Sequence, residues 1–296
     1  MSTSDIFQSD RPRLFSIAYR MLGSASDAED VLQDAWLRYS TADRDAVRSP
    51  QAFATTIVTR LCLDRLKSAR ATREQYIGPW LPEPVLTSTA DGPDTLAQRA
   101  ESVTLAFLVM LEQLAPDERA VLLLKDVFGY DHGEVAEMLG VSPENSRQLL
   151  HRAKHRLQGQ EQPPRGTFDA RRAVAERFTR AFATGDAPTL ASLLRHDIGL
   201  WSDGGGKVSA ARRPLLGLDE VVRFLVGLHR TSHRPGVPQG QWSGRIVEVN
   251  AEPALLIFDA GVLVSVFVLT VEDEQVAAIR VVRNPDKLGA LARQLG

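Results

Sequence analysis

The chain has 296 residues, a formal net charge of −2, and 44% hydrophobic and 24% charged residues. This composition is typical of a soluble globular protein of about two domains. The low net charge excludes a uniformly basic nucleic-acid coat, so any contact with DNA must be local. The single cysteine, Cys62, excludes an internal disulfide and a cysteine-based metal site.

Neither a membrane span nor an export signal is expected. The longest apolar stretch near the C-terminus, Val262–Leu269, is too short to cross a bilayer. Met1–Asp5 has no basic start followed by an apolar segment. The chain has no paired metal-ligand spacing and no phosphate-binding GxxxxGK[ST] motif. We therefore expect a cytoplasmic protein with no metal and no cofactor.

The chain begins with two amphipathic helices. Leu14–Leu22 ends at Gly23, and Ala28–Tyr39 follows. Four acids and no base lie between Asp27 and Leu37. Such a run is commonly a solvated face; the alternative is an acidic docking surface for a basic partner helix.

A third helix is predicted over Gln51–Arg73, and its C-terminal half is basic. An acidic helix and a basic helix in one three-helix unit suit a protein that binds a macromolecule with one face and nucleic acid with another. Tyr76–Pro93 contains four prolines, which predict an extended connector. Its apolar pair Trp80-Leu81, within WLPEP, is either incidental or docks on another part of the protein.

Asp117–Leu157 contains the strongest motif in the chain. Gly140 suits the left-handed position that ends a helix, Ser142 is placed to N-cap the next helix, and Pro143 falls at its first position. From Ser142 to Leu157, four Lys or Arg residues accompany one acid, a bias that suits phosphate contact. A short helix, a glycine corner and a capped polar helix predict a DNA-reading helix-turn-helix.

The pattern changes after a second linker at Gln158–Gly166. Three helices are predicted first, followed by four strands separated by turns such as Glu252-Pro253. This order predicts an α+β domain with a curved sheet on helices. The predicted helices are Phe168–Phe182, Leu190–Leu194 and Glu220–Leu228, and the strands are Gly244–Val249, Ala254–Asp259, Val262–Thr270 and Gln275–Arg283.

Three runs, LFSIAYRMLGSASDAEDVLQDAWLRY, FATTIVTRLCLDRLKSAR and GVSPENSRQLLHRAKHRL, resemble bacterial sigma factors of the extracytoplasmic-function type. The tail, with DGGGK and NPDKL, resembles a SnoaL-like domain of the NTF2-like cone fold, and WLPEP, DGGGK and NPDKL together resemble the sigma factor J type. The resemblance implies sigma region 2 at 1–75, a linker at 76–94, region 4 at 95–158, a linker at 159–167 and a SnoaL-like regulatory domain at 168–296.

The resemblance also implies partners and site residues. The partners are the clamp helices and flap of core RNA polymerase, promoter DNA, and the sigma body itself for the C-terminal domain. The residues implied for docking on the polymerase are Asp27, Glu29, Asp30, Gln33, Asp34 and Trp36. Those implied for binding the −10 element are Thr56, Thr59, Arg60, Asp64 and Arg65. Those implied for binding the −35 element are Ser142, Asn145, Ser146, Arg147, Gln148, His151 and Arg152. Regulation falls to Trp80, Leu81, Asp203, Gly204, Gly205, Gly206, Lys207, Asn284, Pro285, Asp286, Lys287 and Leu288.

Two other functions fit part of the sequence. A helix-turn-helix regulator with a ligand-binding domain would not need the acidic helix at Asp27–Arg38. A SnoaL-like isomerase or cyclase would need an acid–base pair, for which Asp203, His196 and His229 are available. The glycine-rich run Asp203–Lys207 is either an anion-binding loop or a turn between strands. Because fold analogy does not establish catalysis, we expect a protein that is not an enzyme.

Overall fold

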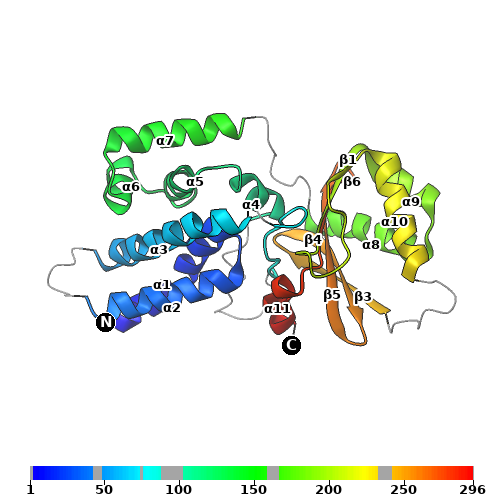
Figure 1. The fold of residues 1–296 in the computed structure, drawn as a ribbon, viewed down its shortest axis with the longest axis horizontal. Coiled ribbons are helices and arrows are strands. Elements are labelled where there is room, and N and C mark those ends of the chain that lie inside the picture. The colour runs from blue at the N-terminus through cyan, green and yellow to red at the C-terminus, as the bar shows by residue number, and fades with distance from the viewer. Residues whose placement is uncertain are drawn as a thin grey trace. The chain divides into compact units, whose positions relative to one another are not determined.

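The computed structural model describes residues 3–42, 49–73, 76–87, 103–158, 167–232 and 242–295. Its backbone contacts divide the chain into two units, shown in Figure 1: unit 1 contains residues 1–75 and 91–161, and unit 2 contains residues 76–90 and 162–296. Residues 88–102, which span the expected boundary at 94, and the second linker at 159–166 lie outside the described residues.

Unit 1 begins with three packed helices, α1 (Thr3–Leu22), α2 (Ala25–Ser40) and α3 (Pro50–Arg73). Ser24 caps α2 by accepting a hydrogen bond from the Asp27 amide. The first helix is longer than its apolar pattern predicts, because Phe7 packs on Trp36 with ring centroids 5.3 Å apart and so anchors the first turns.

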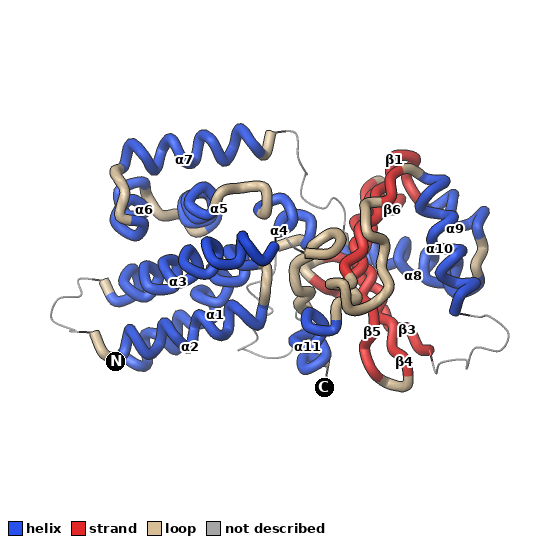
Figure 2. Tube along the Cα trace, in the orientation of Figure 1, coloured by secondary structure: helices blue, strands red, loops and turns tan. Residues whose placement is uncertain are grey.

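The rest of unit 1 is also helical, as the blue segments of Figure 2 show. Its core is joined to the first three helices by the buried Arg119, which donates to the carbonyl of Met21 at 2.6 Å. Burial lowers the pKa of Arg119 to about 10. The elements are α4 (Leu105–Leu111), α5 (Pro116–Leu122), the π-helical turn η3 (Leu123–Val127), α6 (His132–Leu139) and α7 (Pro143–Arg156).

Unit 2 is a six-stranded mixed sheet with helices. Its strand order is β2-β1-β6-β5-β4-β3, with β1 parallel to β6 and the other pairs antiparallel. The strands are β1 (Leu194–Asp203), β2 (Leu215–Leu216), β3 (Trp242–Val249), β4 (Glu252–Asp259), β5 (Val262–Glu272) and β6 (Gln275–Val282), and the helices are α8 (Phe168–Thr184), α9 (Ala187–Leu193), α10 (Leu218–Ser232) and α11 (Pro285–Gln294).

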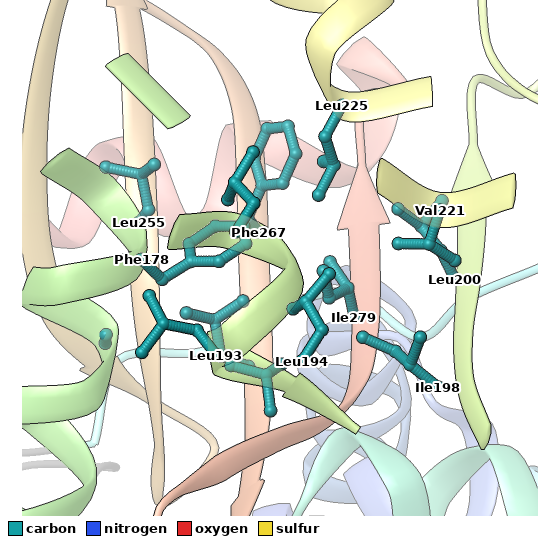
Figure 3. Packing of buried hydrophobic residues seen from close by; sticks show 14 of the residues in the cluster. Phe178, Leu193, Leu194, Ile198, Leu200, Val221, Leu225, Leu255, Phe267 and Ile279 are labelled. Carbon is teal, nitrogen blue, oxygen red and sulfur yellow. The ribbon is translucent and has the colours of Figure 1, made fainter. Parts of the chain in front are cut away.

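Both faces of the sheet are buried along most of β4, β5 and β6. On one face, Leu255, Phe267 and Ile279 point toward Phe178 and Leu225 of the helices, as Figure 3 shows. The alternate residues on the other face are buried as well, and α11 lies on that side in Figure 1. These alternate residues include Ala254, Leu256, Val266, Val268 and Val282.

The sequence prediction differs from unit 2 in two places. It has no strand at β1 or β2, because the charged run Arg195–Asp197 interrupts the apolar alternation of β1. It also places a turn at Glu252-Pro253, whereas both residues belong to β4. The turn is made instead by Asn250 and Ala251, which both have positive φ angles.

Candidate nucleic-acid interface and linker-binding site

The helix-turn-helix corner is built from local capping interactions. Asp131 and Glu134 form a capping box at the start of α6, with Glu134 accepting from the Asp131 amide at 2.8 Å. Gly140 ends α6 in the left-handed conformation with φ 69°. Ser142 then caps α7 by accepting from the Asn145 amide at 3.2 Å, and Pro143 follows. The caps therefore lie where the sequence predicts them.

Most of the predicted −35 residues lie on the outer face of α7. Arg147, Gln148 and His151 are exposed, and Arg147 has only a loose ion pair with Glu144 at 3.5 Å. Arg152 is exposed too, but its Nε donates to the buried carboxylate of Glu118 on α5 at 3.2 Å. The side chains with the most freedom to meet a ligand are therefore those in the first half of α7.

Ser146 does not belong to this outer face. It is fully buried, and its hydroxyl lies 2.9 Å from Nδ1 of His132 at the start of α6. The hydroxyl joins the two helices of the corner, so in this conformation Ser146 is not exposed for the predicted base contact. The sequence spacing cannot distinguish it from Asn145 and Arg147, because the burial of position 146 depends on where α6 packs.

The predicted polymerase-docking residues form an exposed acidic face of α2, made of Asp27, Asp30, Gln33 and Asp34. Arg65 of α3 is 2.9 Å from Asp27, 3.5 Å from Asp30 and 3.8 Å from Asp34. One cation thus faces three carboxylates, and the face keeps a negative charge. Leu37, 63% exposed on the last turns of α2, adds an apolar side chain near this face.

The other two docking residues are less available. Glu29 forms an ion pair with Arg11 of α1. Trp36 is half-buried and packs on Phe7 and Tyr39.

The predicted −10 residues are distributed around α3. Arg60 and Asp64 are exposed and Thr56 is half-buried, but Thr59 is fully buried and cannot meet a ligand in this conformation. Arg65 faces the acids of α2. The guanidinium of Arg60 donates to the carbonyls of Met138 at 3.0 Å and Glu137 at 3.4 Å, at the C-terminal end of α6. The expected −10 helix therefore contacts the helix-turn-helix within unit 1.

Segment 76–87 of the expected linker packs in unit 2. Leu81 and Val85 are buried. The carboxylate of Asp203, at the end of β1, is fully buried and accepts from the Leu81 amide at 2.8 Å and from the Tyr76 hydroxyl at 2.5 Å. Val85 donates its amide to Asn250 Oδ1 at 3.0 Å. Two backbone amides of this proline-rich segment thus donate to buried side chains of β1 and of the turn between β3 and β4.

Lys287, on the first turn of α11, completes this arrangement. Its ammonium donates to Asp203 at 2.7 Å and to the Leu81 carbonyl at 2.6 Å. It also lies 4.1 Å from the centre of the Trp80 ring and 4.9 Å from that of Tyr76. The linker-binding cluster, as we name this group, consists of Tyr76, Trp80, Leu81, Asp203, Asn284 and Lys287.

The glycine-rich loop after Asp203 owes its composition to this packing. A side chain at Gly205 would place its Cβ 2.3 Å from Asn284 Nδ2, and one at Gly206 would lie 2.9 Å from Ile77 Cδ1. Both glycines also have positive φ angles. Asn284 caps α11 and donates to the Tyr76 hydroxyl at 2.9 Å.

The remaining motif residues are placed around the start of α11. Lys207 pairs with Asp286 at the surface. Gly204 is buried, Pro285 opens α11, and Leu288 is buried.

Tyr76 and Asn250 are two of the residues holding the segment that sequence reasoning missed. Tyr76 bonds to both Asp203 and Asn284, and burial, followed by the Asp203 hydrogen bond, raises the pKa of its phenol. Asn250 is fully buried and binds the Val85 amide. An asparagine between two predicted strands is a turn signal that could have drawn attention to Asn250, whereas Tyr76 carries no motif of its own.

The possible acid–base residues of unit 2 are not gathered at one site. Asp203 is committed to the linker-binding cluster, His196 is exposed on β1, and His229 lies against Gly185. In the described ranges, no three His, Cys, Asp or Glu side chains group as metal ligands would. No helix in the part of the chain that the structure describes is long and apolar enough to cross a membrane.

Two segments of unit 1 match models of known protein families. Residues 6–72 match the family Sigma-70 region 2, and residues 104–157 match Sigma-70, region 4. The ECF RNA polymerase sigma factor SigJ of Mycobacterium tuberculosis is 39% identical over 293 residues, which cover 95% of this chain and 91% of the relative. The probable ECF RNA polymerase sigma factor SigI of the same organism is 31% identical, covering 99% of this chain and 97% of its own.

The similarity to a solved structure spans both units. The crystal structure of the M. tuberculosis extracytoplasmic function sigma factor SigJ matches with a TM-score of 0.76 and 34% identity, covering 98% of this chain and 99% of that chain. The predicted fold, two helical sigma regions followed by an α+β domain, is confirmed. The chain belongs to the extracytoplasmic-function family of RNA polymerase sigma factors, which direct transcription initiation.

Proposed function

We propose that the C-terminal domain regulates the sigma factor by holding segment 76–87, which lies in the chain between region 2 and region 4. The observation that carries the proposal is the buried Asp203–Lys287 pair, both of whose members also bond to the backbone of Leu81. Removing either charge leaves the other buried without its partner, so the hold is specific to these residues. A held segment limits the positions that the two regions can take relative to each other.

Regions 2 and 4 contact each other in unit 1, and this contact limits which promoter elements they can reach together. The −35 and −10 elements lie about 25 base pairs apart, which is about 85 Å at about 3.4 Å per base pair. Helix α3 has 24 residues and is therefore about 36 Å long. While Arg60 bonds to the end of α6, the two regions cannot both reach their elements, so promoter binding requires this contact to break.

The site residues follow from exposure in unit 1. Region 4 reads the −35 element through Asn145, Arg147, Gln148 and His151 on α7. Region 2 meets the −10 element through Thr56, Arg60 and Asp64 once α6 has moved away. The acidic face of α2 docks on the clamp helices of core polymerase, and region 4 meets the flap. The protein works in the cytoplasm, where the polymerase is.

The C-terminal domain performs no catalysis in this proposal. The buried Asp203 has its oxygens occupied by Lys287, Tyr76 and the Leu81 amide, so it is not available as a general base. The role of Asp203 in this proposal is to bind the linker.

Run-off transcription with purified core polymerase tests the proposal. The full chain is compared with the double variant Trp80→Ala, Leu81→Ala, which weakens the hold on the segment without changing a proposed DNA-reading or polymerase-docking residue. We expect higher output from the variant at equal protein concentration, because the restraint is removed. Equal output, together with hydrogen exchange showing that segment 76–87 has been released, would refute the regulatory role.

A further inference from the structure

Unit 2 contains a cavity of about 320 Å³ between helices α8 and α10 and one end of strands β3, β4 and β5. Small-molecule sites commonly have volumes of about 300–1,000 Å³, so this cavity suits a small ligand. Phe182 and Phe267 stand against each other in its wall, with ring centroids 5.5 Å apart. The other apolar lining side chains include Leu228, Leu255 and Ile257.

Ser265 is a polar residue in an apolar row. Alternate residues of β5 share one face of the sheet, and the next two positions on this face, Phe267 and Leu269, belong to the buried core. Ser265 is only 4% exposed and lines the cavity, and its hydroxyl has no hydrogen-bond partner among the residues that the structure describes. A buried hydroxyl without a hydrogen-bond partner is destabilising, so a ligand that bonds to the Ser265 hydroxyl would be favoured here.

Arg283 brings a positive charge to the same end of the cavity. The register pairs Val266 with Val282, so the next position places residue 283 opposite Ser265 on the same face. Arg283 lines the cavity and is largely buried, which lowers its pKa. Among the described residues its guanidinium donates one hydrogen bond, to the carbonyl of Ser209, and no carboxylate there pairs with it.

Gly244 keeps this end of the cavity open. It pairs with Ile257, which in turn pairs with Ser265, so the three residues form one row across the sheet. A Cβ on Gly244 would lie 3.2 Å from Leu255 Cδ1 and would crowd the lining. With Arg283 opposite Ser265, this end of the cavity combines a small residue, a hydroxyl and a guanidinium at the edge of an apolar space.

We propose that this cavity binds a small hydrophobic carboxylate. Its apolar body packs against the phenylalanine wall, and its carboxylate accepts hydrogen bonds from Ser265 and Arg283, whose planar guanidinium matches a carboxylate in geometry. The proposal goes beyond the regulatory function, since binding does not depend on transcription. The carboxylate end adjoins the linker-binding cluster, because the next residue, Asn284, donates to Tyr76.

Isothermal titration calorimetry of the full chain with 2-naphthoate tests the proposal, with the neutral 2-naphthamide as the matched probe. We expect saturable binding of one 2-naphthoate per chain, and weaker binding of the amide. Arg283→Met should weaken 2-naphthoate binding about tenfold or more, as expected for a lost hydrogen bond to a charged group, and leave amide binding nearly unchanged. Arg245→Met, at an exposed position that does not line the cavity, is the control.

A second variant tests the cavity itself. Ser265→Leu should fill the space and abolish binding of both probes. Ser265→Ala only removes the hydroxyl and should weaken 2-naphthoate binding, so it tests the site even if the leucine variant does not fold. Absence of saturable binding to the wild-type protein would overturn the proposal. Equal affinity of the wild-type and Arg283→Met proteins for 2-naphthoate would overturn it as well, because the cavity would then recognise no anion.

Discussion

The ammonium of Lys287 lies 2.7 Å from a carboxylate oxygen of Asp203, and the two side chains are only 9% and 0% exposed. The residues are far apart in the chain, one at the start of α11 and the other at the end of β1. Their pairing holds the end of β1 and the start of α11 together around the backbone of Leu81. Segment 76–87, which precedes region 4 in the chain, is thereby packed into unit 2.

The first prediction concerns this pair. Lys287→Met leaves the Asp203 carboxylate buried without its cation, and the loss of one partner of a buried pair costs about 3–5 kcal/mol of unfolding free energy. Urea denaturation measures the loss, and hydrogen exchange at the Leu81 amide reports release of the segment. Lys207→Met is the control, because its ion pair is at the surface and is worth about 0–1 kcal/mol. Wild-type protection of the Leu81 amide in Lys287→Met would contradict the assignment.

Features that depend on a few neighbouring residues could be predicted from the sequence, whereas features that depend on tertiary packing could not. The corner of the helix-turn-helix was predicted because Gly140, Ser142 and Pro143 act on the next turn of their own chain. The burial of Ser146 was not predicted, because it depends on packing against α6. Strand β1 was not predicted either, because it depends on parallel pairing with β6.

The linker-binding cluster shows the same division. The motifs WLPEP, DGGGK and NPDKL stand out in the sequence, but nothing in the spacing pairs Asp203 with Lys287 or adds Tyr76 to the group. The unsatisfied hydroxyl of Ser265 is likewise visible only once the neighbouring strands are in place.

The second prediction concerns the −35 element. Arg147 is exposed in the first half of α7, where a side chain can reach base edges, and a bidentate contact is worth about 1–3 kcal/mol of discrimination. Arg147→Ala should weaken binding to the promoter and relax selectivity at one base pair, measured with a set of single-base variants. Lys154→Ala should instead mainly reduce the salt dependence of binding. An unchanged selectivity profile for Arg147→Ala would remove it from the reading face.

The third prediction concerns polymerase docking. Reversing two charges on the acidic face of α2, with Asp30→Arg and Asp34→Arg, places like charges at the proposed interface, which costs several kcal/mol. Core polymerase should then no longer be retained by the variant in a pull-down. The matched control, Asp169→Arg with Asp219→Arg, reverses two exposed acids of unit 2 and should bind normally. Normal retention of the first variant, with a native circular dichroism spectrum, would exclude this face.

The fourth prediction concerns alkaline pH. Burial and the Asp203 hydrogen bond raise the pKa of Tyr76 above the usual value of about 10. The native state then holds the phenolic proton more tightly than the unfolded state, so this contribution to stability is complete below about pH 10 and is lost as the pH rises through the raised pKa. The Tm of the wild-type protein should fall more steeply above pH 10 than that of Tyr76→Phe. Parallel Tm curves would show that Tyr76 ionises as freely in the native state as in the unfolded one.

The fifth and most direct measurement is the separation of α3 and α7 in the free protein. Two dyes can be attached at Gln51→Cys and His155→Cys, which are exposed positions, because the native Cys62 is fully buried and burial raises its pKa. If the held segment restrains the two regions, energy transfer should be high in the wild-type background and should fall in Lys287→Met, with Lys207→Met unchanged. Identical transfer in the wild-type and Lys287→Met backgrounds, after hydrogen exchange has shown the segment to be released, would contradict the account.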